Sequence, residues 1–328
     1  MRAGAESFRR DAERMRLARL LACDPEELRF LDTLDAGELR LLRLATKEWL
    51  GRAMRPLLLR AIQASTLLPS ALVASIGRET LGPLLSARFS DYMNRSQLVS
   101  ISRHHPAAFL AEVGLHLDID KLSELAVAMP PDILRAVVRE VLARKEYIML
   151  GELLDRLPPT RLPHVARELT EGEPYLRTMF FVESPARRQE IVEMLPEGVL
   201  YDSMRAVARS PEALLPMALS LTLEVSPAWQ RRMAVHALEN GDSLLGDLVA
   251  GIVRLDMWRV ALPLMERLSP QEIGRLMHLP VWRDATVLDA LLKGGASPPL
   301  RPWLEALLDQ MPPELATMAR QRLAEHSS

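Results

Sequence analysis

Residues 147–170 combine two short amphipathic helices and a sharp corner, and no other feature of the sequence constrains the fold as much. Apolar side chains recur at helical spacing at positions 148, 150, 153, 154 and 157, before Pro158 and Pro159, and at 162, 165 and 169 after them. Leu157 is pushed out of the helical region by the ring that follows it, whereas Pro159 suits the first turn of the next helix. Neither helix can bury its apolar stripe alone, so the stretch predicts a helical hairpin that stacks on its neighbours.

The same corner recurs along the chain. Its copies read AMPPDIL, RLPPTRL, MLPEGVL, EVSPAWQ, RLSPQEI and QMPPELA, at residues 128–134, 156–162, 194–200, 224–230, 267–273 and 310–316. The spacing between copies varies from 28 to 43 residues, as expected where insertions fall in the turns between repeats. We therefore predict an all-α protein that forms an irregular α-solenoid, or superhelix, of helical hairpins.

The composition supports helices packed on helices. Of the 328 residues, 48% are hydrophobic but only 5% are aromatic, whereas β-sheets favour aromatic and β-branched side chains. The net charge of −2 gives no electrostatic footprint for nucleic acid. Cys23 is the only cysteine, so neither an intrachain disulfide nor a multi-cysteine metal site can form, and a reducing cytoplasm is the expected location.

Three regions follow from these patterns. We expect a less regular helical region at 1–119, helical-hairpin repeats at 120–293, and a C-terminal capping hairpin at 298–328 that continues the solenoid. Capping residues predict helices at about 25–34 and 36–50. Further helix starts are predicted near Pro56, Ser70, Pro83, Ser96 and Pro106. The glycines and prolines of residues 293–299 predict a break before the last hairpin.

The corners also carry a family resemblance. An apolar helix ends in Leu or Met, Pro-Pro or Pro-Glu follows, and a second helix carries Leu three to four residues further on. At residues 120–209, and more faintly at 256–325, this pattern resembles the helical N-terminal cytosolic domain of MgtE-type magnesium transporters and the related helical repeats of the flagellar motor switch protein FliG. The resemblance implies a superhelical fold that contacts other proteins, and it implies no activity. No membrane region, paired nucleotide-binding-like module or torque-helix charge pattern accompanies it, so no metal-binding or torque residue is carried over.

The longest uncharged run covers residues 61–77. It is too short and contains too many polar residues to predict a membrane-spanning helix, so we expect two buried helices broken near Pro69. The first 21 residues mix arginines with acidic residues, which a secretory signal does not do. The N-terminus therefore predicts the first helix.

Motifs for catalysis or nucleotide binding are absent from the sequence. It contains no GxGxxG, no Walker A loop, no GxSxG and no HExxH, so we predict a non-enzymatic protein without a cofactor. His104 and His105 are adjacent and point to different sides of a helix. His116, Asp118 and Asp120 could attract a cation, although a solvated loop is the more common fate of such a stretch. Three further histidines fall in different hairpins and are expected to make local hydrogen bonds: His164, His236 and His278.

Tryptophans mark the C-terminal half about once per hairpin, at Trp229, Trp258, Trp282 and Trp303. Arg259 and Arg283 directly follow two of them, and Trp and Arg are over-represented among binding hot spots. These six residues are the predicted partner-binding site, with Trp258 and Trp282 as the leading candidates. The alternative, and the more common role of any single tryptophan, is to fill the gap between neighbouring hairpins.

Three functional hypotheses remain. The leading one is a protein-interaction scaffold or adaptor that binds a partner segment on a concave helical surface. The alternative is a carrier of an apolar small molecule or lipid, which the uncharged run at 61–77 and the sixteen methionines favour. The third is a helical-repeat enzyme acting on nucleic acid, which the near-neutral charge disfavours.

Overall fold

All regular structure in the computed structural model is helical, which confirms the all-α prediction. The structure describes residues 2–239, 241–265, 267–296 and 300–326, and these ranges contain no strand. The chain divides into two compact units, Met1–Glu168 and Leu169–Ser328. This division differs from the three predicted regions, because helices of region 1–119 pack directly against the first hairpins of region 120–293.

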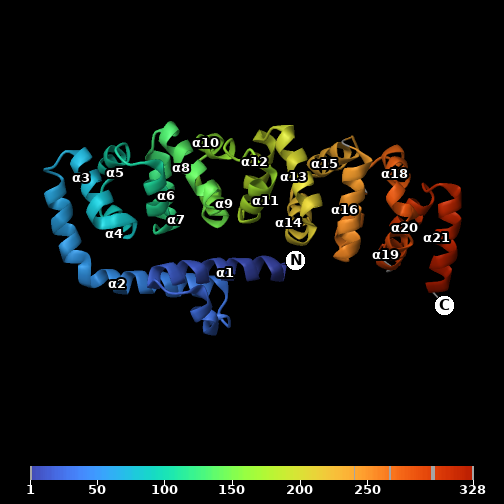
Figure 1. Ribbon diagram of the computed structural model, residues 1–328, viewed down its shortest axis with the longest axis horizontal. Coiled ribbons are helices and arrows are strands. Elements are labelled where there is room, and N and C mark those ends of the chain that lie inside the picture. The colour runs from blue at the N-terminus through green and yellow to red at the C-terminus, as the bar shows by residue number, and fades with distance from the viewer. Residues whose placement is uncertain (1, 240, 266, 297–299, 327–328) are drawn as a thin grey trace. The chain divides into compact units, whose positions relative to one another are not determined.

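The first unit begins with two long helices. α1 (Arg2–Leu21) lies beside α2 (Ala36–Ser65), and the 3-10 helix η1 (Pro25–Leu31) connects them. Asp24 and Asp35 form the capping boxes expected from the sequence, although the first of these starts a 3-10 helix that is shorter than predicted. We call α1, η1 and residues 36–55 of α2 the N-terminal arm. The arm runs along one edge of the later helices of this unit (Figure 1).

Short helices complete the first unit. They are α3 (Ser70–Ile76), the π-helical η2 (Gly77–Leu81), α4 (Gly82–Ser90), α5 (Arg95–Ser102), α6 (Ala107–Leu115), α7 (Ile119–Ala128), α8 (Pro131–Ala143), α9 (Tyr147–Arg156) and α10 (Leu162–Ala166). Contacts link helices two places apart, so that α3, α5, α7 and α9 form one row and α4, α6, α8 and α10 another. The predicted helix starts near Ser70, Pro83, Ser96 and Pro106 are confirmed to within a residue.

The predicted helix start near Pro56 is wrong, because Pro56 lies inside α2. A proline within a helix removes one backbone hydrogen bond and clashes with the carbonyl four residues earlier, which bends a helix without necessarily ending it. Figure 1 shows α2 turning between its two halves before it reaches α3. The chain then breaks before Ser70, near Pro69 as predicted, but the helices on either side are not fully buried. In the described part of the chain, no helix is long and apolar enough to cross a membrane.

The second unit is built from helices of similar length. They are α11 (Gly172–Phe180), α12 (Pro185–Met194), α13 (Glu197–Arg209), α14 (Pro211–Glu224), α15 (Pro227–Glu239), α16 (Asp242–Arg254), α17 (Trp258–Met265), α18 (Pro270–Met277), the 3-10 helix η3 (Pro280–Arg283), α19 (Ala285–Gly295), α20 (Arg301–Leu308) and α21 (Pro313–His326). Odd-numbered helices contact in succession from α11 to α21.

All six predicted corners lie between consecutive helices, and the predicted core face of 147–170 is also correct. Leu153, Leu157 and Leu162 are all buried. One detail is wrong: Pro159 lies in a turn, and α10 begins only at Leu162, because the Arg161 amide donates to the Pro158 carbonyl and closes the turn first.

The prediction of a break at 293–299 is wrong in part. Gly294 and Gly295 belong to α19, and residues 297–299 lie outside the described residues. A Cβ at Gly294 would lie only 2.6–2.7 Å from the Trp258 side chain. The glycine therefore permits a close helix contact and does not interrupt the helix.

Candidate functional site

Trp258 and Trp282 are core residues, which corrects their assignment to a partner-binding surface. Their side chains are 1% and 0% exposed, and the ring centroids lie 6.1 Å apart. The Trp282 indole N–H donates to the Leu276 carbonyl at 2.7 Å. Burial of so large an apolar side chain stabilises the hairpin stack, so both rings fill the space between neighbouring helices and neither is available to a partner.

The other four residues of the predicted partner-binding site are Trp229, Trp303, Arg259 and Arg283. No contact that the structure describes joins any of them to Trp258 or Trp282. Trp229 is half-buried, with the Arg232 guanidinium 4.6 Å above its ring. Trp303 is half-buried and Arg283 is exposed. The side chain of Arg259 lies outside the described residues. Partner binding by these four residues stays a prediction.

Of the three histidines expected to make local hydrogen bonds, the structure shows such a bond for His278. No group of three metal-ligating side chains occurs among the described residues. His278 Nδ1 lies 2.7 Å from the Gly274 carbonyl, and His236 meets the Tyr201 ring edge-on. Asp118 is held by Arg43 and Lys47, so the stretch at 116–120 is tied to the N-terminal arm.

An apolar cavity of about 360 Å³ lies inside the first unit. Its walls come from the second half of α2 and from each helix from α3 to α9. Leucine, valine, methionine, alanine and phenylalanine side chains dominate the lining, and no charged side chain takes part in it within the described chain. A concave apolar space of this size is typical of small-molecule sites.

Four serines in the cavity wall use their hydroxyl protons internally, and the first of them, Ser65, donates to the Ile62 carbonyl at 2.7 Å. Ser86 donates to the Gly77 carbonyl at 3.3 Å, Ser90 to Ala87 at 2.7 Å, and Ser102 to Val99 at 2.9 Å. A hydroxyl that donates to a backbone carbonyl still offers its oxygen lone pairs. These serines are therefore hydrogen-bond acceptors for anything that enters the cavity.

His105 is the one histidine in the cavity wall as described. Its ring stacks on Phe109 with centroids 4.6 Å apart, and its Nδ1 is buried without a hydrogen-bond partner. Burial, followed by the charges of Arg78 and His104, lowers the pKa of His105 to about 4. The imidazole is therefore neutral at physiological pH.

Gly77 brings these polar groups together. It opens the π-helical segment η2, and a Cβ on it would lie 3.4 Å from Ser86 Oγ, 3.6 Å from His105 Cε1 and 3.7 Å from His105 Nε2. The absence of a side chain lets the imidazole and the serine approach the same backbone position. This corner is the most polar part of an otherwise apolar wall.

Exposed apolar side chains are confined to one part of the chain. Every large hydrophobic residue that is exposed in the described structure lies between Met15 and Leu84. Leu68 and Ile76 are exposed and also line the cavity, while neighbouring Leu67 is 86% exposed. The rim of the cavity is therefore apolar as well, unlike the surface of an ordinary monomer, where large exposed apolar patches are rare.

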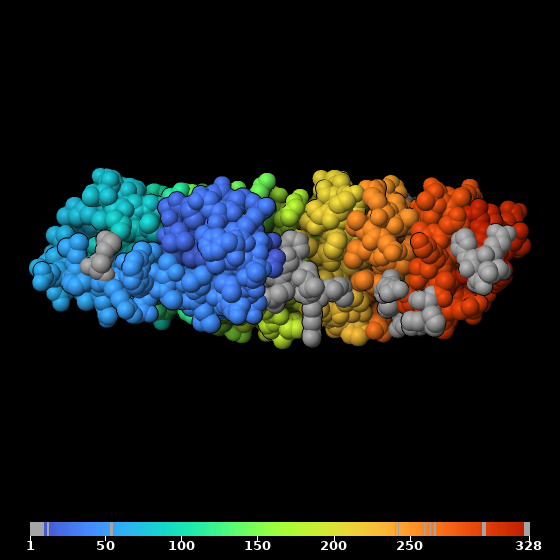
Figure 2. Space-filling model, turned by 90° about the horizontal axis from the view of Figure 1, so that it is seen from below, coloured from blue at the N-terminus to red at the C-terminus, as the bar shows by residue number. Residues whose placement is uncertain are grey.

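The N-terminal arm is attached to the later helices by charged side chains. Arg16 donates to both carboxylate oxygens of Glu152, at 2.7 and 2.5 Å, and Lys47 contacts Asp118 at 2.5 Å and Asp91 at 3.2 Å. Figure 2 shows the arm, in blue, covering this face of the first unit. These ion pairs connect the arm to α9 and to the ends of α4 and α7.

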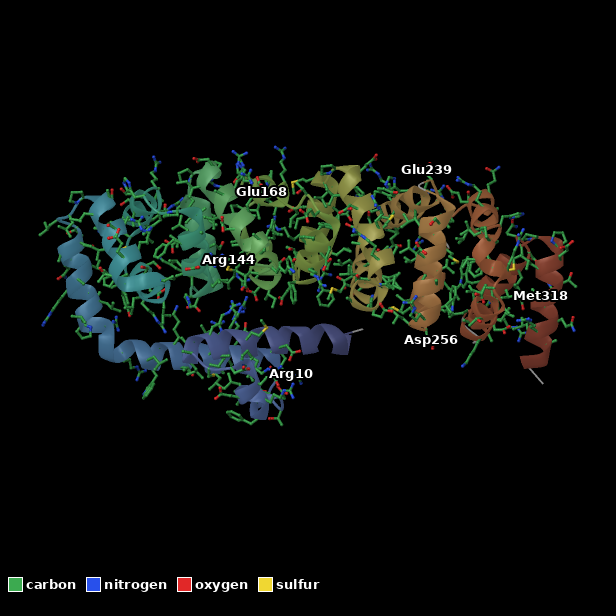
Figure 3. All side chains as sticks on the ribbon, viewed as in Figure 1. Arg10, Arg144, Glu168, Glu239, Asp256 and Met318 are labelled. Atoms are coloured by element: carbon green, nitrogen blue, oxygen red, sulfur yellow. The ribbon has the colours of Figure 1, made fainter. Side chains whose placement is uncertain are left out.

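The contacts between the arm and the later helices shift the pKa of Asp118. Burial would raise the pKa of Asp118, but hydrogen bonds and charges from Lys47 and Arg43 outweigh burial and hold the pKa below its usual value. Asp91 behaves differently, because burial raises its pKa and Lys47 only partly opposes this. Within the arm, Arg10 donates to the Asp32 carbonyl at 3.0 Å (Figure 3).

The cavity and the charged contacts share a wall. Gly114, Leu117, Leu122 and Met149 line both the apolar cavity and a smaller space of about 60 Å³ beneath the charged contacts. On the other side, Arg144 at the end of α8 donates to Glu112 of α6 at 2.9 Å (Figure 3). Polar contacts thus fix several of the helices that line the cavity.

Sequence reasoning missed His105, Ser86 and Gly77 as site residues, although the uncharged run at 61–77 did indicate an apolar site and forms part of the cavity wall. A scan against protein-family models, a search of curated proteins and a search of solved structures find no match to this chain. Function must therefore be inferred from the chemistry of the cavity and its surroundings.

Proposed function

We propose that the first unit binds an apolar small molecule or lipid in the cavity between α2 and α9. The observation that carries this proposal is the volume of about 360 Å³ within apolar walls. Apolar walls that face such a space forgo contact with other apolar atoms, and this loss is energetically costly. Water gains little in such a space because its walls offer few polar partners. An apolar occupant would remove most of this cost.

The exposed apolar rim supports the same function. Leu68 and Ile76 belong both to the rim and to the wall, so an apolar molecule would meet hydrophobic surface before it enters. A protein without a ligand to admit would gain from covering these side chains, since exposed fractions of 41% and 38% forgo part of the ~1.5–3 kcal/mol that full burial of a leucine or isoleucine contributes.

The proposal is tested with an uncharged fluorescent probe, N-phenyl-1-naphthylamine, whose emission rises in apolar surroundings. We expect saturable binding to the full chain, and native mass spectrometry of the purified protein should detect a co-purified apolar molecule. Ala126 is buried and lines the cavity, so Ala126→Phe should weaken probe binding about tenfold. The control is Ala143→Phe at the exposed end of α8, outside the cavity. Absence of saturable binding to the wild-type chain would refute the proposal.

A second candidate function is the protein-interaction scaffold, and the arm favours it more than the tryptophans of the second unit do. Leu41 and Trp49 are 68% and 70% exposed on the outer side of α2. Contacts between helices two places apart, seen in both units, support an irregular α-solenoid, an architecture that often binds partner proteins. A cytoplasmic location and the likeness to MgtE-type and FliG helical domains remain proposals of the same kind. Loss of a specific crosslinked partner on Trp49→Lys would support this function.

A further inference from the structure

We propose that the ligand of this cavity is an uncharged lipid with one hydroxyl group, and that His105 Nε2 and Ser86 Oγ hydrogen-bond that hydroxyl. This inference rests on the function proposed above and specifies its ligand. It follows from the polar corner at Gly77, from the absence of charge elsewhere in the described wall, and from the hydrogen-bond roles of the two side chains.

The imidazole of His105 has unused hydrogen-bonding capacity. Its Nδ1 is buried without a partner, and neither ring nitrogen makes a hydrogen bond among the described residues. A buried N–H without a partner costs more than a buried acceptor without one, so we assign the proton of the neutral ring to Nε2. The N–H then lies at the Gly77 corner, beside Ser86.

The two groups at this corner have complementary roles. Nε2–H is a donor, whereas Ser86 Oγ is an acceptor because its own proton is given to the Gly77 carbonyl. A hydroxyl group accepts one hydrogen bond and donates another, so it can satisfy both. A ketone or an ether could accept from His105 but could not donate to Ser86.

A carboxylate fits this site less well. No cationic side chain lines the described cavity, and a buried unpaired carboxylate is far more costly than a buried hydroxyl. Arg78 is the cation that acts on His105, but it is occupied by the Glu79 carboxylate at 3.0 Å and is itself exposed. The neutral imidazole therefore offers a hydrogen bond and no compensating charge.

The volume sets the size of the ligand. At ~30 Å³ for each water-sized group, about 360 Å³ holds roughly twelve non-hydrogen atoms, and a larger probe such as N-phenyl-1-naphthylamine extends through the open side of the cavity. A chain of eight carbons with one oxygen fits this space and stays soluble enough for titration. Octan-1-ol, octane and octanoate therefore serve as matched probes, each measured by displacement of N-phenyl-1-naphthylamine at pH 7.5.

His105→Phe separates the hydrogen bond from the hydrophobic contact, because phenylalanine keeps the ring and its stacking on Phe109 but removes both nitrogens. We expect the affinity for octan-1-ol to fall about tenfold and the affinity for octane to stay within about twofold. Ser86→Ala is a second variant with a smaller side chain and the same expected pattern. His104→Phe is the control, since His104 is exposed and contacts Ser70 outside the cavity.

The possible results separate failure of the hydroxyl assignment from failure of the proposed function. If His105→Phe and Ser86→Ala weaken octan-1-ol and octane by the same factor, or if wild-type protein binds octanoate more tightly than octan-1-ol, the hydroxyl assignment is overturned while the cavity remains a ligand site. If wild-type protein binds neither N-phenyl-1-naphthylamine nor any of the three probes, the proposed function itself fails. Selective loss of octan-1-ol in both variants supports the assignment.

Discussion

The two units solve the same packing problem in different ways. The second unit fills the space between its helices with large side chains such as Trp258 and Trp282, and it exposes no large hydrophobic residue in its described part. The first unit leaves a cavity of about 360 Å³, and its first 84 residues carry all the large apolar side chains that are exposed in the described structure. Similar short helices therefore leave a larger apolar cavity in the first unit than in the second.

A closer comparison concerns the polar groups inside each unit. The second unit has a smaller apolar cavity of about 190 Å³, where Gln230 donates to the Leu223 and Val225 carbonyls and accepts from Arg267. In the first unit, His105 faces a cavity of nearly twice this volume without any such partner. Thr178 Oγ1 and Trp258 Nε1 in the second unit are also buried without a hydrogen-bond partner, but neither residue lines the smaller cavity, whereas His105 lines the larger one.

The largest effect should follow from adding one methyl group to the second unit. A Cβ on Gly172 would overlap the backbone of Asp202 and Ser203, which cannot move aside as a flexible side chain could. Gly172→Ala should therefore lower the free energy of unfolding by about 3 kcal/mol or more. Chemical denaturation followed by the fluorescence of the buried tryptophans provides the measurement.

The matched control for this change is Gly246→Ala. Gly246 lies inside α16, and a Cβ there meets nothing within 4 Å. Alanine is the better helix former, so this variant should gain about 0.5–1 kcal/mol. Equal effects of the two substitutions would show that α11 and α13 are not as tightly packed as the comparison requires.

The pH dependence of stability should differ between the units. The folded-state pKa of His105 is about 4, below the unfolded value of 6.5, so the unfolded chain binds more protons between these two pH values. The first unit should therefore lose stability as the pH falls from about 6.5 to 4. Because the ring is partly exposed, solvent screening limits the loss from His105 to about 2 kcal/mol. Hydrogen exchange of peptides from α5 and α6 measures it.

His105→Phe should remove most of this pH dependence. Some will persist, because burial followed by Arg19 and Arg88 also lowers the pKa of His116. His104→Phe serves as the control: the charge of His104 is the smallest of the causes that lower the pKa of His105, so most of the pH dependence should remain. A profile that is the same in wild type and in His105→Phe would show that the imidazole is solvated and can take up a proton without opening the cavity wall.

In both units, the sequence predicts where the helices lie along the chain better than it predicts the contacts and cavities between packed helices. Corners such as those at Pro130 and Pro312 are set locally, because proline fixes its own backbone and restricts the residue before it. Pro56 shows the limit of this signal, since it lies inside α2 and does not end the helix. Helical spacing likewise identified Leu153 and Leu157 as core residues.

The candidate site depends on contacts that local patterns do not specify. His105 faces Gly77 only because α3 and α5 pack side by side, and the cavity requires side chains from α2 to α9. For the same reason a tryptophan near the start of a helix can face either a groove or the next hairpin. Trp258 faces the neighbouring hairpin because Gly294 allows its ring to approach closely. The spacing of tryptophans in the sequence does not predict this contact.

Filling the apolar cavity of the first unit should stabilise the protein, whereas adding side-chain volume to the packed second unit should destabilise it. Ala126→Phe places a ring in the cavity, so it should raise the free energy of unfolding by about 1 kcal/mol even as it weakens ligand binding. In the second unit, Ala206 is buried and lies outside the smaller cavity, and Ala206→Phe should cost about 1–3 kcal/mol. Thermal denaturation of both variants measures the contrast, and destabilisation by both would mean that the first unit is as full as the second.

The smallest effect on stability should come from the exposed face of the arm. Trp49 is 70% exposed, so Trp49→Lys should change the free energy of unfolding by less than about 0.5 kcal/mol. Leu39, in the same helix but fully buried, is the matched control, and Leu39→Lys should destabilise the first unit by several kcal/mol because it buries a charge. Between these two variants, retention on a hydrophobic column should fall for Trp49→Lys alone, because Trp49 is part of the exposed apolar surface and Leu39 is not. A large loss of stability in Trp49→Lys would show that the indole packs on the free chain. Trp49 would then contribute to the packing of the first unit and not to an exposed apolar surface. The contrast between the two units would in that case depend only on the sizes of their cavities.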